Sequence, residues 1–179
     1  ELGDVIGVIL GFDKFIAMQA VRPLGLVASL DLLLAHPHWR DAVDAERIGG
    51  FGASLGGEAM LLLGGAGLTT SIGQSSKRVL FEPRLKAAVG YVPYFGQAML
   101  PAFGRDQHGV DGVSLPYLAI GGTADVVAPL AEIEDAMVRL SGTRQIVALR
   151  GVEHGLELVD LPDVLTWTLG FLDGQVRGD

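Results

Sequence analysis

RIGGFGASLGGEAMLLL, residues 47–63, is the stretch of sequence that decides the fold of this chain. Its first part, 47–52, predicts a short buried strand, and its second part, 54–63, predicts an apolar helix that ends in a glycine-rich turn. The pentapeptide Gly52-Ala53-Ser54-Leu55-Gly56 lies where the two meet and has the spacing G-x-S-x-G. Such a turn lifts the serine hydroxyl out of the sheet edge. We expect glycine at both flanking positions because side chains would collide there.

Outward from this stretch, apolar residues alternate between the strand period and the helix period. Further strands are predicted at 85–92, 116–121 and 144–150, and further helices at 21–35, 128–140 and 161–172. The first of these helices is expected to begin at Val21, with Pro23 in its first turn, and to end before Pro37. Residues 97–115 have no clear period and are expected to form a loop or a small insertion. This alternation predicts an α/β protein, with a mostly parallel sheet, helices on both faces and ligands at the carboxyl ends of the strands.

Composition bounds the class of protein. The chain has 179 residues, of which 49% are hydrophobic, enough for one domain over 1–179 with a buried core. Its formal net charge of −8 argues against nucleic acid and anionic lipid as partners. With no cysteine, disulfides, thiolate metal sites and a cysteine nucleophile are excluded. No run reaches the roughly 18 uninterrupted apolar residues of a membrane span.

The sequence leaves the compartment open. It begins with Glu1 instead of methionine, so we expect a processed product or part of a longer one. A cytoplasmic protein and one secreted after removal of a signal peptide both fit this start.

Three polar side chains directly follow three of the predicted strands. Ser54 follows the first strand, Asp125 the third and His154 the fourth. Each has an ordinary alternative: a plain glycine turn, an aspartate that caps a helix and a surface histidine. Together, however, they have the order of a nucleophile, a carboxylate that orients an imidazole and a general base, all at one sheet edge. The backbone N–H of Leu55, at the start of the helix, would point at the developing oxyanion.

The sequence also resembles a known family, the bacterial α/β-hydrolases described as predicted dienelactone hydrolases, which are relatives of platelet-activating-factor acetylhydrolase. The resemblance spans roughly 22–175 and is carried by Arg22-Pro23-Leu24, Leu30-Asp31-Leu32-Leu33, the G-x-S-x-G stretch, Pro116–Asp125 and Val152-Glu153-His154-Gly155. It implies an α/β-hydrolase fold, with Ser54 as nucleophile, Asp125 as acid and His154 as base. It implies no metal and no organic cofactor.

The chain departs from this family in two ways. True dienelactone hydrolases use a cysteine nucleophile, so the implied activity here is that of a serine esterase. The family also has several strands before the matched region, and one of them is followed by the loop that supplies a second oxyanion N–H. Nothing in 1–21 resembles that loop, so we expect a variable lead-in segment there. We therefore expect the carboxyl-terminal part of a catalytic domain, completed by a companion amino-terminal fragment or associating as a homo-oligomer.

These observations predict a serine carboxylic ester hydrolase, lipase-like or polyester-cleaving variants included, acting on a small or lipid-like ester. The alternatives are an acyltransferase, a thioesterase or a peptidase with the same triad, and a non-catalytic binding module of the same fold. An apolar acyl pocket is predicted after the second strand, and core packing is the alternative role for its residues. Those residues are Tyr91, Val92, Tyr94 and Phe95, with Met99, Leu100 and Phe103 following in the loop.

Overall fold

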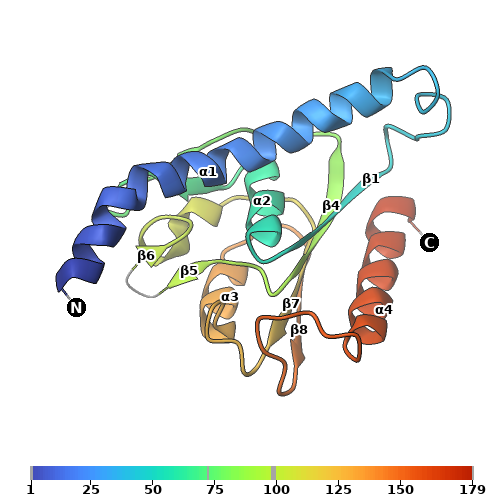
Figure 1. The fold of residues 1–179 in the computed structure, drawn as a ribbon. Coiled ribbons are helices and arrows are strands. Elements are labelled where there is room, and N and C mark those ends of the chain that lie inside the picture. The colour runs from blue at the N-terminus through green and yellow to red at the C-terminus, as the bar shows by residue number, and fades with distance from the viewer. Residues whose placement is uncertain (1, 72, 98–99, 179) are drawn as a thin grey trace.

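The computed structural model describes residues 2–71, 73–97 and 100–178, and its centre is a four-stranded sheet (Figure 1). All neighbouring strands are parallel, in the order β1-β4-β7-β8. The strands are β1 (Ile48–Ala53), β4 (Leu85–Tyr91), β7 (Tyr117–Gly122) and β8 (Arg144–Leu149). The four strands predicted from periodicity are therefore confirmed to within two residues at each end. Because the strands are parallel, their carboxyl ends lie at one edge of the sheet.

Helices cover both faces of this sheet. Helices α2 (Leu55–Leu63) and α3 (Leu130–Met137) pack on one face, and α4 (Leu161–Leu172) packs on the other. Side chains of the central strand β7 alternate between the two cores. Tyr117 and Ala119 join the α2–α3 core, while Leu118 and Ile120 join the α4 core. A strand buried on both faces explains why 117–122 is a continuous apolar run in the sequence.

Helix α1 (Leu2–Ala35) is much longer than the sequence predicted. It runs without a break from Leu2 through the segment where a variable lead-in was expected, and Pro23 lies inside it instead of in its first turn. The expected start was wrong because a proline removes one hydrogen bond but does not by itself end a long helix that packs on another element. In Figure 1 this helix lies across α2, on the side away from α4.

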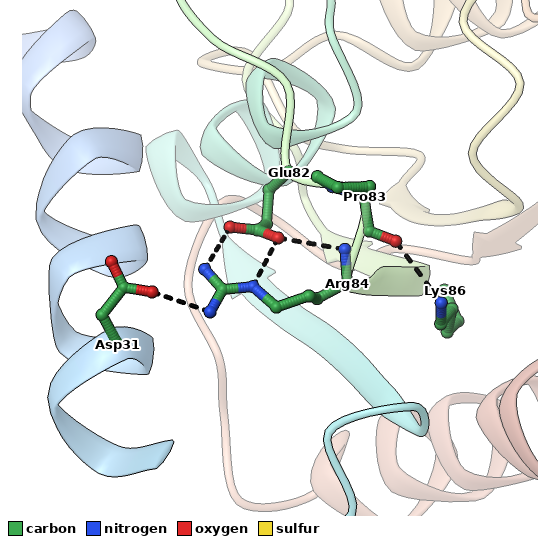
Figure 2. Close-up of polar contacts among 5 residues, drawn as sticks. All are labelled: Asp31, Glu82, Pro83, Arg84 and Lys86. Carbon is green, nitrogen blue, oxygen red and sulfur yellow. Dashed lines mark hydrogen bonds and ion pairs between the residues drawn. The ribbon is translucent and has the colours of Figure 1, made fainter. Parts of the chain in front are cut away.

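A charged cluster ties α1 to the beginning of β4. Figure 2 shows the Arg84 guanidinium between two carboxylates: Nη1 donates to Asp31 Oδ1 on α1 at 2.7 Å, and Nε donates to Glu82 Oε1 at 2.7 Å. The hydrogen bonds from Arg84 lower the pKa of Glu82. The cluster fixes the position of α1 along the sheet more than it adds stability, since Asp31 is exposed.

The connections contain short elements that periodicity did not detect. Two antiparallel pairs lie in the stretch before β7, and residues 97–115, expected to be a loop, include a 3-10 helix. A π-helix follows α4. These elements are β2 (Gly67–Thr69) with β3 (Ser76–Arg78), β5 (Gly96–Gln97) with β6 (Leu100–Pro101), η1 (Arg105–Val110) and η2 (Asp173–Arg177). Strands of two or three residues are too short to give a period. Met99 lies outside the described residues.

The α1–β1 side of the molecule exposes apolar surface. β1 pairs only with β4 among the described strands, and Phe51 on β1 is 46% exposed. An apolar groove of about 250 Å³ runs between β1 and the side chains of Leu26, Val27 and Leu30. By length and composition, Lys14–Ala35 would also suffice to cross a membrane, a criterion that core helices and signal sequences meet as well. The sequence analysis expected no membrane span because no apolar run is long enough without interruption. That expectation stays a prediction.

Candidate active site

Ser54 lies in the sharp turn between β1 and α2. Its φ of 54° and ψ of −120° are strained for a residue with a side chain. Hydrogen bonds of its backbone N–H and carbonyl hold Ser54 in this conformation. Its N–H donates to the carbonyl of Tyr91 at 2.9 Å, at the end of the neighbouring strand β4. Its carbonyl accepts from the N–H of Gly57, at 2.9 Å, and of Tyr94, at 3.0 Å. The next strand and the loop after it therefore fix the serine at the carboxyl edge of the sheet.

Glycines make this turn sterically feasible, although not at both positions that the sequence predicted. A Cβ on Gly52 would collide with the backbone of Gly56, so glycine is required at the first position. A Cβ on Gly56 would meet nothing within 4 Å, so the expected requirement at the second position is wrong. The close packing falls one residue later, where a Cβ on Gly57 would lie 2.7 Å from Cβ of Pro93.

The three side chains that follow three strands form one hydrogen-bonded chain. Ser54 Oγ lies 2.8 Å from Nε2 of His154, and Nδ1 of His154 lies 2.8 Å from Oδ2 of Asp125. A carboxylate only accepts hydrogen bonds, so the Asp125 contact favours the imidazole tautomer with its proton on Nδ1. Nε2 is then free to accept the serine proton. The three residues are 29 and 100 positions apart, which means that the fold and not local sequence brings them together.

Asp125 is held by the loop that follows β7. Its side chain is fully buried, and its Oδ1 accepts the backbone N–H groups of Val127 and Ala128, both at 2.8 Å. The other oxygen, Oδ2, is left for His154. Asp125 therefore does not cap α3, as its ordinary alternative role predicted, because the N-cap of α3 is Pro129 and receives no side-chain hydrogen bond. It holds the turn before α3 and also contacts the imidazole.

The loop with His154 rests on the ends of β4 and β7. Tyr91 OH donates to the carbonyl of Gly155 at 2.7 Å, and Gly122 lies so close to the Val152 carbonyl that a Cβ there would collide with it. Burial, followed by the negative charges of Asp160, Asp125 and Glu157, raises the pKa of the Tyr91 phenol. The phenol therefore stays protonated as a donor to this loop.

Leu55 is the first residue of α2, next to Ser54. The first N–H groups of an α-helix have no acceptor within the helix, and the helix dipole makes that end favourable for negative charge. The backbone N–H of Leu55 is thus one of the first N–H groups of α2, and its role as an oxyanion donor stays a prediction.

The four residues predicted to line an acyl pocket are found in different surroundings. Tyr91 and Val92 belong to the core under α4, and Phe95 packs on Phe103 in the other core. Tyr94 lines a cavity beside α1. The core alternative that the sequence left open thus describes the positions of Tyr91, Val92 and Phe95.

Sequence reasoning missed one buried polar pair near Ser54. Glu58, one turn further along α2, is 1% exposed and accepts a hydrogen bond from Nε2 of Gln19 on α1 at 2.5 Å. Burial raises the pKa of Glu58 to about 7, against the opposing effects of Gln19 and Arg22. A glutamate in the apolar run 55–63 and a glutamine in the apolar stretch 15–21 were the available signals. In the part of the chain that the structure describes, no group of acidic or histidine side chains is arranged to hold a metal ion.

Comparisons with known proteins agree with this arrangement at the level of fold. No family model and no curated protein matches the chain. Among solved structures, it is similar to an alpha-beta serine hydrolase homologue from Coxiella burnetii, with a TM-score of 0.52 and 13% sequence identity. The chain has an α/β-hydrolase fold. The match covers 83% of this chain and 56% of the other, so the chain spans little more than half the length of that structure.

Proposed function

We propose that this chain carries the catalytic centre of a serine hydrolase that cleaves carboxylic esters through an acyl-enzyme. The observation that supports it most is the chain of hydrogen bonds from Ser54 through His154 to Asp125, with 2.8 Å at both steps. Serine hydrolases that form an acyl-enzyme use the same three groups. They are a strained serine at a strand–helix turn, an imidazole in reach of its hydroxyl and a buried carboxylate behind the imidazole.

The proposed reaction begins at the Ser54 hydroxyl. His154 Nε2 takes its proton while Oγ attacks the ester carbonyl, and Asp125 stabilises the imidazolium that forms. The carbonyl oxygen becomes an oxyanion next to the Leu55 N–H. As the tetrahedral intermediate collapses, His154 returns the proton to the departing alcohol and Ser54 is acylated. Water then repeats these steps on the acyl-enzyme, releasing the acid and restoring Ser54. Every proton in this cycle is carried by His154, so the proposal needs no cofactor.

The surroundings of the triad favour an uncharged, apolar ester. The residues that follow Asp125 and His154 in their loops expose large apolar side chains: Val126 is 83% exposed, Leu158 89% and Val159 76%. Exposed apolar side chains in the loops that carry Asp125 and His154 support a preference for an apolar ligand. This agrees with the esterase or lipase-like activity implied by the resemblance to predicted dienelactone hydrolases and platelet-activating-factor acetylhydrolase relatives.

The proposal is tested by hydrolysis of p-nitrophenyl butyrate by the chain and by Ser54→Ala. We expect turnover in the unsubstituted chain and a loss of at least about 10³-fold in Ser54→Ala, since the nucleophile is removed. Ser29→Ala is the matched control, because Ser29 is exposed on α1 and its hydroxyl donates to the Gly25 carbonyl of the same helix. Equal rates for Ser54→Ala and Ser29→Ala would overturn the proposal.

A further inference from the structure

Tyr91, the last residue of β4, contacts both sides of the Ser54–His154 pair. Its backbone carbonyl accepts the Ser54 N–H at 2.9 Å, and its phenol donates to the carbonyl of Gly155, the residue after His154, at 2.7 Å. Strand β4 lies inside the sheet, paired with β1 on one side and β7 on the other. Both contacts therefore start from a firmly held position, and one residue links the serine turn to the loop that carries the base.

The loop with His154, residues 151–155, is attached to the sheet edge at both ends. Its first residue, Gly151, donates its N–H to Thr123 Oγ1 at 2.9 Å. Thr123 lies in the loop that also carries Asp125, so this contact fixes the base relative to its carboxylate. The contact at the other end, from Tyr91, fixes the base relative to the serine turn.

The hydroxyl of Tyr91 is not needed for packing. Tyr91 is 1% exposed, and its ring belongs to the core under α4. A phenylalanine ring would fill the same place without a buried hydroxyl that requires a partner. The Gly155 carbonyl lies in an exposed loop, where water could satisfy it. The effect of this hydrogen bond is therefore to hold the loop.

We propose that Tyr91 is a positioning residue of the triad, whose phenol keeps His154 Nε2 within hydrogen-bond distance of the Ser54 hydroxyl. This inference rests on the proposed function, since the position of the base matters only if it takes the serine proton. Without the phenol, the loop would stay attached near Asp125 but could move away from Ser54. A displacement of a catalytic group by about 1 Å costs up to about 10²-fold in rate.

The kinetic test is Tyr91→Phe, which keeps the ring and removes the donor. We expect kcat/KM for p-nitrophenyl butyrate and the rate of Ser54 labelling by a fluorophosphonate to fall about ten- to a hundred-fold, because both need His154 to take the serine proton. Tyr91→4-aminophenylalanine restores an N–H donor and should recover most of the loss. Thr69→Val is the matched control: it removes another buried hydroxyl, which donates to the Pro101 carbonyl, and should leave both rates within two-fold.

The geometry itself is measured by NMR, without turnover. The ¹⁵N resonance of His154 Nε2 reports the hydrogen bond from Ser54. In Tyr91→Phe this resonance should move toward its position in Ser54→Ala, where that hydrogen bond is missing, and in Thr69→Val it should not move. A general loss of stability would not shift it in the folded chain.

The outcomes separate this inference from the proposed function. A chain that neither hydrolyses esters nor is labelled would overturn the proposed function, and the resonance would then decide whether Tyr91 holds His154. In an active chain, rates that Tyr91→Phe leaves within two-fold, a resonance that does not move, or a loss that 4-aminophenylalanine fails to recover would each overturn the positioning role.

Discussion

Asp125 divides its two carboxylate oxygens between structure and chemistry. Oδ1 is saturated by the N–H groups of Val127 and Ala128, and Oδ2 holds His154. Because Oδ1 is fixed by two backbone donors, the carboxylate has little freedom to turn. The imidazole is therefore held in one orientation, with Nε2 toward Ser54, before any substrate arrives.

Asp125→Asn should separate these two tasks. The amide oxygen can take the place of Oδ1, while the amide NH₂ faces His154 Nδ1 and stabilises the wrong tautomer. We expect kcat for an ester to fall by about 10⁴-fold, with little change in Tm. The control is Asp111→Asn, an exposed aspartate paired with Arg139 and His108, which should leave kcat within two-fold. Full activity in Asp125→Asn would show that this carboxylate does not orient the base.

Gly52 and Gly56 are predicted to respond oppositely to alanine. In Gly52→Ala, the new methyl meets the backbone of Gly56, so we expect a loss of at least about 2 kcal/mol in the free energy of unfolding. In Gly56→Ala, the methyl enters open space in the first turn of α2, and stability should be unchanged or up to about 1 kcal/mol higher. Urea unfolding of both variants measures the difference. Equal losses would mean that the turn is packed differently.

At the scale of single residues, the sequence predicted positions in space correctly where they follow from the end of a strand. Ser54, Asp125 and His154 were selected because parallel strands end at a common edge, and the structure brings them to that edge. The pair Gln19 and Glu58 was not found, since a contact across 39 residues between two helices leaves no local pattern. Gly56 was misjudged because the motif gives the spacing of glycines but not the direction of their hydrogens.

At the scale of elements, buried strands were easier to predict than helix α1. In a parallel sheet covered by helices, a short continuous apolar run such as 117–122 indicates a strand that is buried on both faces. By contrast, Leu2–Ala35 contains Pro23, which made a helix start near that residue the natural prediction, whereas the helix begins much earlier and its middle packs on α2 and the core.

The contact of α1 with α2 should depend on pH through Glu58. Its pKa is about 7 in the folded chain and about 4.5 in a model peptide, so the folded state binds more protons between these values. Stability is therefore highest below about pH 4.5 as far as this group is concerned, and falls as pH rises through 7. The difference of about 2.5 pKa units corresponds to roughly 3 kcal/mol.

Urea unfolding of the chain and of Glu58→Gln at pH 5.5 and 8.5 measures this dependence. The chain should lose stability at the higher pH, and Glu58→Gln should lose about 2 kcal/mol less of it. Glu134→Gln, an exposed glutamate on α3, is the matched control and should behave like the unsubstituted chain. Identical pH dependence in Glu58→Gln and the unsubstituted chain would contradict a buried, protonated Glu58.

At the scale of the whole molecule, the β1 edge of the sheet has unpaired backbone groups and exposed apolar surface. Among the described strands, β1 pairs on one side only, and the groove beside it is apolar. Unpaired edges of this kind attract further strands. We expect β1 to be covered in solution by a second copy of the chain or by a companion segment.

Hydrogen exchange tests this expectation. If β1 is covered, its amides should exchange nearly as slowly as those of the central strand β4, and the protection should increase with chain concentration when a second copy is responsible. Fast exchange throughout β1 at every concentration, in a monomeric chain that hydrolyses esters, would contradict it.

The central claim, that Ser54 is a nucleophile activated by His154, is tested most directly by a fluorophosphonate probe. The labelled chain is digested, and the modified residue is identified by tandem mass spectrometry. We predict one adduct on Ser54, its formation slowed at least about 10³-fold in His154→Ala, because the hydroxyl loses its base. A chain that stays unmodified, or an adduct on another residue that persists in Ser54→Ala, would contradict the claim.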